Sequence, residues 1–218
     1  MCSCSFYFVE PAVGYQRKDK LYSRAKREGY RSRAAYKLLE LDQRLGLIKS
    51  GMRVVDLGCA PGGWMQVAAT KVGKRGFVVG IDRFPMEPVD GNHACALVAD
   101  VSDDGTKGAI LEKLCGPADV VLSDMAPDTT GVGFADHANS LELTRLATEL
   151  AAELLGPGGA LVAKVFDGPD LNELVEHMKK DFGKVRRLRL KSTRKGSSEL
   201  YLHARKQRRR EHESGKRA

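Results

Sequence analysis

Short apolar runs, each bordered by glycine, proline or aspartate, recur through the middle of the chain. They cover residues 53–57, 77–81, 94–99, 119–122 and 160–165. Continuous apolar runs of this length are typical of strands that are buried on both faces of a parallel sheet. The segments between them are long enough for crossover helices. The alternation of strand and helix therefore predicts an α/β fold, a doubly wound sheet with helices on both faces.

The clearest crossover helix is predicted at residues 140–155. Four leucines share one face there, and a Gly-Pro pair ends the helix: Leu143, Leu146, Leu150, Leu154, Gly156 and Pro157. A second helix is predicted at residues 32–45, before the first strand. After Asp181 the pattern changes to two strand-like runs, 184–190 and 199–204, joined by a short polar segment. The sum is a mostly parallel sheet of seven strands whose last pair includes an antiparallel member.

Length and composition favour one domain. A chain of 218 residues with 42% hydrophobic content suits a single α/β core, which is predicted to span residues 15–206, with a basic N-terminal segment and helix at 15–50. The tip, residues 1–14, is expected to be disordered, and the tail, 207–218, charged and frayed. Neither a secretion signal nor an apolar run of ~18 residues is found, which predicts a cytoplasmic protein without membrane contact. The five cysteines form no paired C-x-x-C clusters, so no metal site is expected.

The net charge of +8 conceals an uneven distribution. Residues 17–37 contain nine basic and two acidic side chains, and residues 184–210 contain twelve and one, whereas residues 38–181 contain thirteen and twenty-two. A basic run by itself is often only a solvated surface, but two of them favour a polyanionic partner. Tyrosines interleave with arginines and lysines in the first, which suits phosphate contacts combined with base stacking. An anionic membrane is less favoured because neither flank has a large apolar helical face.

A glycine-rich turn follows the first predicted strand. The run from Val54 to Trp64 reads V-V-D-L-G-C-A-P-G-G-W, a strand followed by a turn and the start of a helix. Glycines allow a ligand to approach the backbone, and the helix N-terminus supplies amide donors. A dinucleotide site would normally show G-x-G-x-x-G instead, so an oxidoreductase is disfavoured.

Aspartates stand at the ends of the next three predicted strands. Asp82 can accept both ribose hydroxyls of a nucleoside, Asp100 can accept from an adenine amino group, and Asp124 ends the fourth strand. Any one of them could merely cap a helix. Together they would meet at the carboxyl edge of the sheet, where open α/β folds bind ligands. An acidic pocket suits an adenosyl group with a cationic sulfonium, which predicts S-adenosylmethionine as cofactor.

These motifs resemble the RrmJ/FtsJ family of ribosomal RNA 2'-O-methyltransferases, which have a Rossmann-like S-adenosylmethionine-dependent methyltransferase fold. The resemblance covers residues 15–206 and rests on S-R-A-A-Y-K-L at 32–38, D-L-G at 56–58, P-G-G-W at 61–64, S-D-M-A-P at 123–127, K-V-F at 164–166 with Gly168, and S-S-E-L-Y at 197–201. It implies a catalytic set of Lys37, Asp124, Lys164 and Glu199, with Lys164 as proton acceptor. It also implies cofactor contacts from Gly62, Trp64, Asp82, Asp100 and Asp124.

The implied reaction is methylation of a ribose 2'-hydroxyl in RNA, with a uridine in the peptidyl-transferase region of the large-subunit (23S) ribosomal RNA as the expected target. The implied partner is ribosomal RNA in the large ribosomal subunit, with no obligate protein partner. Two alternatives stay open: a transfer RNA substrate, and a non-catalytic assembly factor that binds RNA. The second would be expected to have lost one of the four catalytic positions, and all four are present.

Overall fold

The computed structural model describes residues 20–127, 130, 132–194 and 196–207. Its strands are β1 (Arg53–Leu57), β2 (Phe77–Asp82), β3 (Ala94–Val98), β4 (Ala118–Ser123), β5 (Leu155–Phe166), β6 (Val185–Leu188) and β7 (Glu199–Arg205). Its helices are α1 (Lys20–Arg27), α2 (Ala35–Leu45), α3 (Gly63–Val72), the 3-10 turn Gly73–Arg75, α4 (Thr106–Leu114), α5 (Gly133–Leu154) and α6 (Leu171–Phe182). The predicted tip, 1–14, and residues 208–218 of the predicted tail lie outside the described residues.

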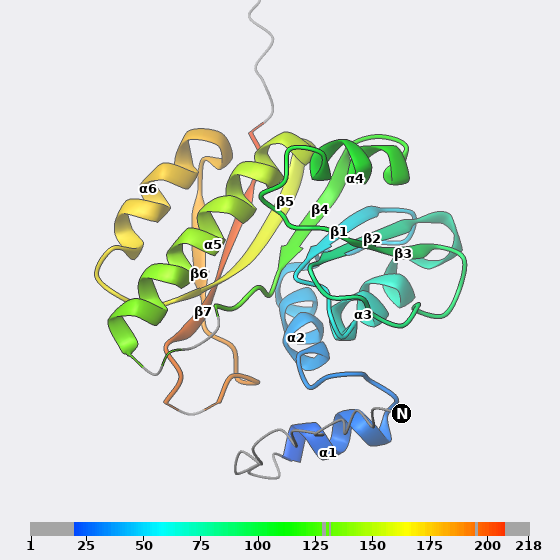
Figure 1. Ribbon diagram of the computed structural model, residues 1–218, viewed down its shortest axis with the longest axis horizontal. Helices are drawn as coiled ribbons and strands as arrows, with labels where there is room; N and C mark the ends of the chain where they lie inside the picture. Colours follow the sequence, from blue (N-terminus) through cyan, green and yellow to red (C-terminus); the bar gives the residue numbers. More distant parts are fainter. Residues whose placement is uncertain (1–19, 128–129, 131, 195, 208–218) are drawn as a thin grey trace, which may run out of the picture.

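The sheet has seven strands in the order β3-β2-β1-β4-β5-β7-β6, as predicted in number and character. Strands β1 to β5 pair in parallel, and β7 is antiparallel to both β5 and β6. The antiparallel member therefore inserts between β5 and β6. Lys164 on β5 stands opposite Tyr201 on β7, and Phe166 stands opposite Glu199. This register brings the last strand of the chain beside β5 at the carboxyl edge of the sheet (Figure 1).

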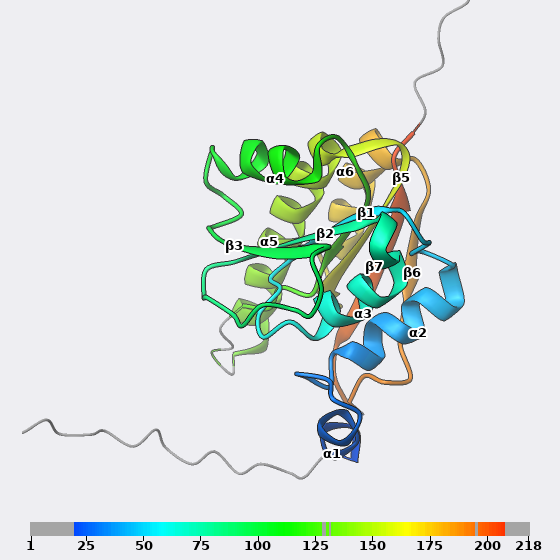
Figure 2. The same ribbon diagram turned by 90° about the vertical axis from the view of Figure 1, so that its right-hand side faces the viewer.

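Two hydrophobic layers cover the sheet. One contains apolar residues of α4, α5 and α6, and the other contains those of α2 and α3. Side chains alternate along each strand, so Leu161, Ala163 and Val165 face the first layer, whereas Ala160 and Val162 face the second. By the same period of two, Lys164 shares the face of α2 and α3. Figures 1 and 2 show the helices on opposite sides of the twisted sheet.

Helix α5 differs from its prediction mainly at its start and in the face it buries. It begins at Gly133, seven residues earlier than predicted, and ends at Leu154, one residue before the predicted end; the Gly-Pro pair that follows lies within β5. Of the predicted leucine face only Leu154 is fully buried. The buried face consists mainly of small and hydroxyl-bearing side chains: His137, Ser140, Thr144, Ala147, Thr148, Ala151 and Leu154. The prediction of a helix was correct, but three of the four predicted leucines, Leu143, Leu146 and Leu150, are partly exposed.

His203 on β7 links the fold to pH. Its side chain is buried, and neither ring nitrogen has a hydrogen-bond partner among the described residues. Burial, helped by the charges of Arg205 and Arg186, lowers the pKa of His203 to about 4. Between roughly pH 6.5 and pH 4 the unfolded chain therefore binds a proton that the native protein does not. Stability due to the neutral ring is present above pH 6.5 and is lost as the pH falls.

We predict that the free energy of unfolding decreases by on the order of 1 to 3 kcal/mol between pH 7 and pH 4.5 because of this residue, and that His203→Leu removes that part of the decrease. Urea denaturation of both proteins at pH 7, 6, 5 and 4.5 measures it. Parallel pH dependences in the two proteins would contradict the assignment.

Candidate active site

A cavity of about 630 Å³ opens at the carboxyl edge of the sheet. Its wall comes from the turn after β1, the ends of β2, β3 and β4, and one face of α5: Gly58, Ala60, Ile81, Asp82, Arg83, Phe84, Ala99, Asp100, Val101, Asp124, Met125, Ala126, Pro127, Asn139, Glu142, Leu143 and Leu146. Cavities of this size hold small organic ligands and cofactors. The three strand-end aspartates predicted from the sequence all line it.

Asp82 is the last residue of β2 and fixes the glycine-rich turn. One carboxylate oxygen accepts a hydrogen bond from the Ala60 amide at 2.9 Å, and the other accepts from the Phe84 amide at 2.9 Å. Each carboxylate oxygen can accept a second bond, so the group can still bind two ligand hydroxyls. The turn and the second strand are thereby positioned together around one acidic side chain.

Asp100 lies two residues beyond the end of β3 and serves a local turn as well as the cavity. One oxygen accepts from the amide and the hydroxyl of Ser102, at 2.9 and 2.7 Å. These bonds lower the pKa of Asp100. Asp100 thus serves the turn after β3 and does not cap α4, whose N-cap residue Gly105 has no side-chain cap hydrogen bond. Both hydrogen bonds from Ser102 end on Oδ1. The other carboxylate oxygen, Oδ2, accepts no hydrogen bond from the described part of the chain and is available to a donor in the cavity.

Gly62 and Trp64 lie beside the cavity but are not part of its lining. Gly62 has a φ of 106°, and a Cβ atom there would lie 2.7 Å from Met86 Cε and 2.9 Å from Arg31 Nη1. Trp64 is in the first turn of α3, with its side chain 3% exposed and its indole N–H donated to the Ala34 carbonyl at 2.8 Å. The Trp64 ring thus packs in the core. Its expected contact with the cofactor stays a prediction and would have to use the backbone.

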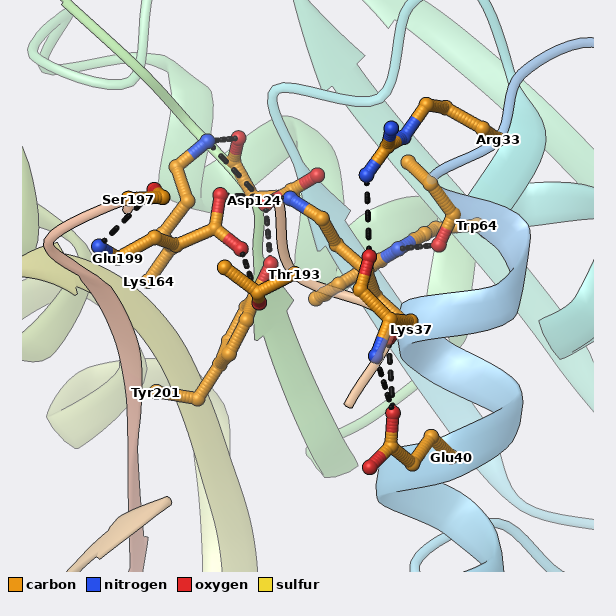
Figure 3. Close-up of polar contacts among 12 residues, drawn as sticks. Arg33, Lys37, Glu40, Trp64, Asp124, Lys164, Thr193, Ser197, Glu199 and Tyr201 are labelled. Atoms are coloured by element: carbon orange, nitrogen blue, oxygen red, sulfur yellow. Dashed lines mark hydrogen bonds and ion pairs between the residues drawn. The ribbon is translucent and has the colours of Figure 1, made fainter. Parts of the chain in front are cut away.

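The four residues of the expected catalytic set meet beside Asp124 (Figure 3). Lys164 Nζ donates to the Asp124 carbonyl at 2.6 Å and lies 3.1 Å from its carboxylate. Lys37 Nζ, from α2, donates to Glu199 at 2.6 Å and lies 4.0 Å from the Asp124 carboxylate. The set thus contains two cations and two anions, all largely shielded from solvent.

Tyr201 was quoted within a sequence motif but was given no role. Its hydroxyl donates to Asp124 at 2.7 Å, and its ring lies 5.9 Å from that of Trp64. Burial, together with the charge of Asp124, raises the pKa of Tyr201 well above its ordinary value, so the phenol keeps its proton and donates. The Tyr-Asp hydrogen bond depends on the β5–β7 register, which a single sequence does not disclose.

The loop between β6 and β7 closes over the set from the side of α2. Glu40 accepts hydrogen bonds from the amides of Lys191 and Ser192 and from the Ser192 hydroxyl, at 2.8 to 3.0 Å. The Thr193 hydroxyl then donates to the second oxygen of Glu199 at 3.0 Å. Glu40, which sequence reasoning missed, thereby attaches this loop to the helix that carries Lys37 (Figure 3).

Two further residues near the cavity were missed. Asp56 in β1 is 1% exposed, and neither carboxylate oxygen has a hydrogen-bond partner among the described residues. Burial, with Asp124 and Asp82 nearby, raises its pKa well above the ordinary value. Phe84 lines the cavity yet is 65% exposed. Both residues could have been found in the sequence. An ionised carboxylate inside a buried strand is costly without a partner, and Phe84 is a large apolar side chain two residues after a strand-end acid.

The fold and the site define the class of protein. Three strand-end carboxylates and a glycine-rich turn line the cavity, and a buried lysine-aspartate pair adjoins it. No described helix is long and apolar enough to cross a membrane. An FtsJ-like methyltransferase family model matches residues 30–207, and the chain belongs to that family. It is therefore an S-adenosylmethionine-dependent methyltransferase.

Individual relatives and a solved structure to which the chain is similar are named as ribosomal RNA methyltransferases. The chain is 48% identical over 195 residues to the ribosomal RNA large subunit methyltransferase E of Haloarcula marismortui, covering 86% of this chain and 74% of the relative. It is 49% identical over 191 residues to the protein of that name from Granulibacter bethesdensis, covering 87% and 80%. A crystal structure from Plasmodium falciparum, named as a ribosomal RNA methyltransferase, has a TM-score of 0.72 at 31% identity, covering 81% of this chain and 98% of the other.

We predict that Asp82→Ala weakens S-adenosylmethionine binding about ten- to a hundred-fold, because a charged hydrogen-bond acceptor of this kind contributes on the order of 1.5 to 3 kcal/mol. Isothermal titration calorimetry on the folded variant measures the change. Asp90→Ala, which removes an exposed aspartate from the loop between β2 and β3, is the matched control. Equal affinities of the two variants would exclude Asp82 as a ribose acceptor.

Proposed function

We propose that the protein transfers a methyl group from S-adenosylmethionine to the 2'-hydroxyl of a ribose in large-subunit ribosomal RNA, at a uridine in the peptidyl-transferase region. One observation carries the chemistry: Asp124 belongs both to the wall of the cofactor cavity and to the group with Lys37, Lys164 and Glu199. A hydroxyl bound between the two lysines would lie beside the cavity. The name that the relatives described above share supports the ribosomal substrate.

The residues available for the cofactor suit its parts. Asp82 would accept the ribose hydroxyls, Asp100 the adenine amino group, and the amides at the start of α3 would lie near Gly62 and Trp64. Phe84 offers an aromatic face beside Asp82. S-adenosylmethionine, when bound, supplies a methyl group on a cationic sulfur. The acidic side chains at this edge favour such a positive charge.

Lys164 is the residue proposed to act on the ribose hydroxyl. An ammonium group has three N–H donors; one donates to the Asp124 carbonyl, and even if a second pointed to the Asp124 carboxylate, 3.1 Å away, a third would remain. The third is free to contact the 2'-oxygen. The oxygen forms a bond to the methyl carbon as the carbon–sulfur bond breaks, and the hydroxyl proton leaves. Two roles stay open: a neutral Lys164 accepts that proton, or a charged Lys164 orients the hydroxyl and stabilises the developing alkoxide.

Asp124, Lys37 and Glu199, the other members of the set, would keep the Lys164 ammonium in place. Glu199, which also accepts from the Thr193 hydroxyl, holds Lys37, whose ammonium lies 4.0 Å from the Asp124 carboxylate. Tyr201 donates to the carboxylate from below. A charge-balanced group of this kind argues against the non-catalytic alternative, since an RNA-binding scaffold has no need for two buried lysine-carboxylate pairs, which are costly to desolvate.

The RNA is proposed to bind at the end of the molecule where α1 and the β6–β7 loop lie. Figures 1 and 2 place both near the carboxyl edge of the sheet. Lys26 and Arg27 on α1 are exposed, and neither forms an ion pair within the described part of the chain. Not every basic residue of the two flanks is available. Arg31 donates to the Pro61, Glu87 and Pro88 carbonyls, and so it supports the glycine-rich turn.

Neutralising Arg31 would therefore disturb the cofactor site, contrary to the simple electrostatic view of the N-terminal flank. In the C-terminal flank, Lys206 donates to the Ala152 and Leu155 carbonyls at 2.6 Å and caps the end of α5. Arg189 pairs with Asp167. Part of each basic flank is thus structural, and the RNA-binding role is proposed for the residues without such partners.

We predict that the double variant Lys26→Gln, Arg27→Gln binds RNA more weakly and with a less steep dependence on salt. The magnitude of the slope of log K against log[salt] should fall by roughly 1.4 to 1.8, because each of two phosphate contacts releases about 0.7 to 0.9 of a counterion. Filter binding at four salt concentrations measures the slope. The matched control is Lys74→Gln, Arg75→Gln, which removes the same charge at the opposite edge of the sheet. Equal slopes for both doubles would reject α1 as a contact.

We predict that Lys164→Ala lowers the single-turnover methylation rate about 10²- to 10⁴-fold at saturating cofactor and RNA, the usual contribution of a positioned acid or base. Cofactor affinity should change little. Lys164→Arg separates the two roles, because arginine keeps the charge but cannot act as a base at neutral pH. Substantial activity of the arginine variant would reject Lys164 as the base, and near-normal activity of the alanine variant would reject both roles.

Mapping of 2'-O-methyl groups in ribosomal and transfer RNA from a deletion strain identifies the target nucleotide.

A further inference from the structure

Helix α5 contacts the backbone of β5 at the position of Lys164. The Thr144 hydroxyl lies 2.8 Å from the Lys164 carbonyl and 2.7 Å from the Ser140 carbonyl, so the two carbonyls share its one proton. The Ser140 hydroxyl accepts the Phe166 amide at 2.9 Å. His137 Nδ1 lies 3.1 Å from the Phe166 carbonyl, which makes this nitrogen the protonated one. Three side chains spaced by three and four residues thus lie on one helical face and bind one short stretch of strand.

These bonds occur where the neighbouring strand has ended. The parallel register between β4 and β5 ends with the pair Ser123 and Ala163, so neither Lys164 nor Phe166 is paired with a residue of β4. A buried backbone group without a partner is unfavourable, and the α5 side chains supply the missing bonds. Strand β4 ends at Ser123, and the next residue is Asp124, which pairs with Lys164.

The burial of these side chains makes the contact specific. Ser140 and Thr144 are 2% and 1% exposed, on a helix face where leucine would ordinarily give more apolar contact. The segment after the strand is fitted to the same face: a Cβ atom on Gly168 would lie 2.4 Å from the His137 ring. Glycine is therefore required for the strand end to approach α5.

We propose that Thr144 and Ser140 are positioning residues, which hold the backbone of Lys164 so that its ammonium remains aligned with Asp124 and the ribose hydroxyl. The inference rests on the proposed role of Lys164. The backbone position of Lys164 determines where its ammonium lies. Lys164 Nζ is 2.6 Å from the carbonyl of Asp124, which directly follows β4, so a shift of the β5 end relative to the β4 end changes this distance. A neighbouring face of α5 lines the cofactor cavity through Asn139, Glu142, Leu143 and Leu146.

The test compares two buried hydroxyls on the same helix. Thr144→Val removes the hydroxyl bonded to Lys164 with little change in shape. Thr148→Val is the matched control, because Thr148 is equally buried but its hydroxyl donates only to the Thr144 carbonyl within the helix. Single-turnover rates are measured at saturating S-adenosylmethionine and RNA, together with calorimetric affinity for the cofactor and the thermal midpoint.

We expect Thr144→Val to lower the rate about five- to tenfold, the factor that corresponds to one net hydrogen bond, with cofactor affinity within twofold of wild type. Thr148→Val should keep the wild-type rate, and Thr144→Ser should restore it. Equal rates of the two valine variants, or a loss confined to cofactor affinity, would overturn the proposal. If Thr144→Val does not fold, Ser140→Ala is held to the same comparison.

Lys164→Ala measured in parallel separates this inference from the proposed function. An inactive Lys164→Ala with a fully active Thr144→Val rejects only the positioning role. An active Lys164→Ala rejects the proposed role of Lys164, on which the inference rests, whereas a wild-type protein without methylation activity rejects the proposed function itself.

Discussion

The contact between Lys164 and Asp124 at the carboxyl ends of β5 and β4 is the interaction on which the site depends. It joins an ammonium to both a carbonyl and a carboxylate of one residue, in surroundings where an unpaired charge would be costly. Around it the chain places a second lysine, a second carboxylate and a phenol. The positive and negative charges of the group thus nearly balance, so it can be buried beside the cofactor cavity. It still offers two lysine ammonium groups to the substrate.

The antiparallel insertion of β7 makes this arrangement possible. If β7 added to the outer edge of the sheet beyond β6, Glu199 and Tyr201 would lie one strand farther from Lys164. In the observed order they are direct neighbours of β5, and the period of two places Tyr201 and Lys164 on the same face. Helix α2 covers that face and contributes Lys37, while Glu40 one turn later holds the β6–β7 loop.

The other face of the sheet contributes less directly. Helix α5 buries serine, threonine and histidine against the end of β5, beyond the last residue pair of the β4–β5 register. The same helix lines the cavity with leucines that remain partly exposed. Hydrogen bonding in the sheet thus explains the unusual polarity of the helix, and the cavity explains its partly exposed leucines. Both are consequences of the point at which β4 ends.

The sequence by itself determined the strands, because apolar runs bordered by turn residues depend on local chemistry; all seven were predicted, and β1 matched at both ends. It also indicated the carboxyl-edge aspartates, since strand ends in a parallel sheet meet at one edge whatever the strand order, and the family resemblance supplied the four catalytic positions. Only the tertiary structure decided which strands are neighbours. The Tyr201-Asp124 bond, the Glu40 attachment, the supporting role of Arg31 and the polar face of α5 all join residues at least 20 positions apart in the chain. Such contacts depend on register and packing, which periodicity along one chain does not encode.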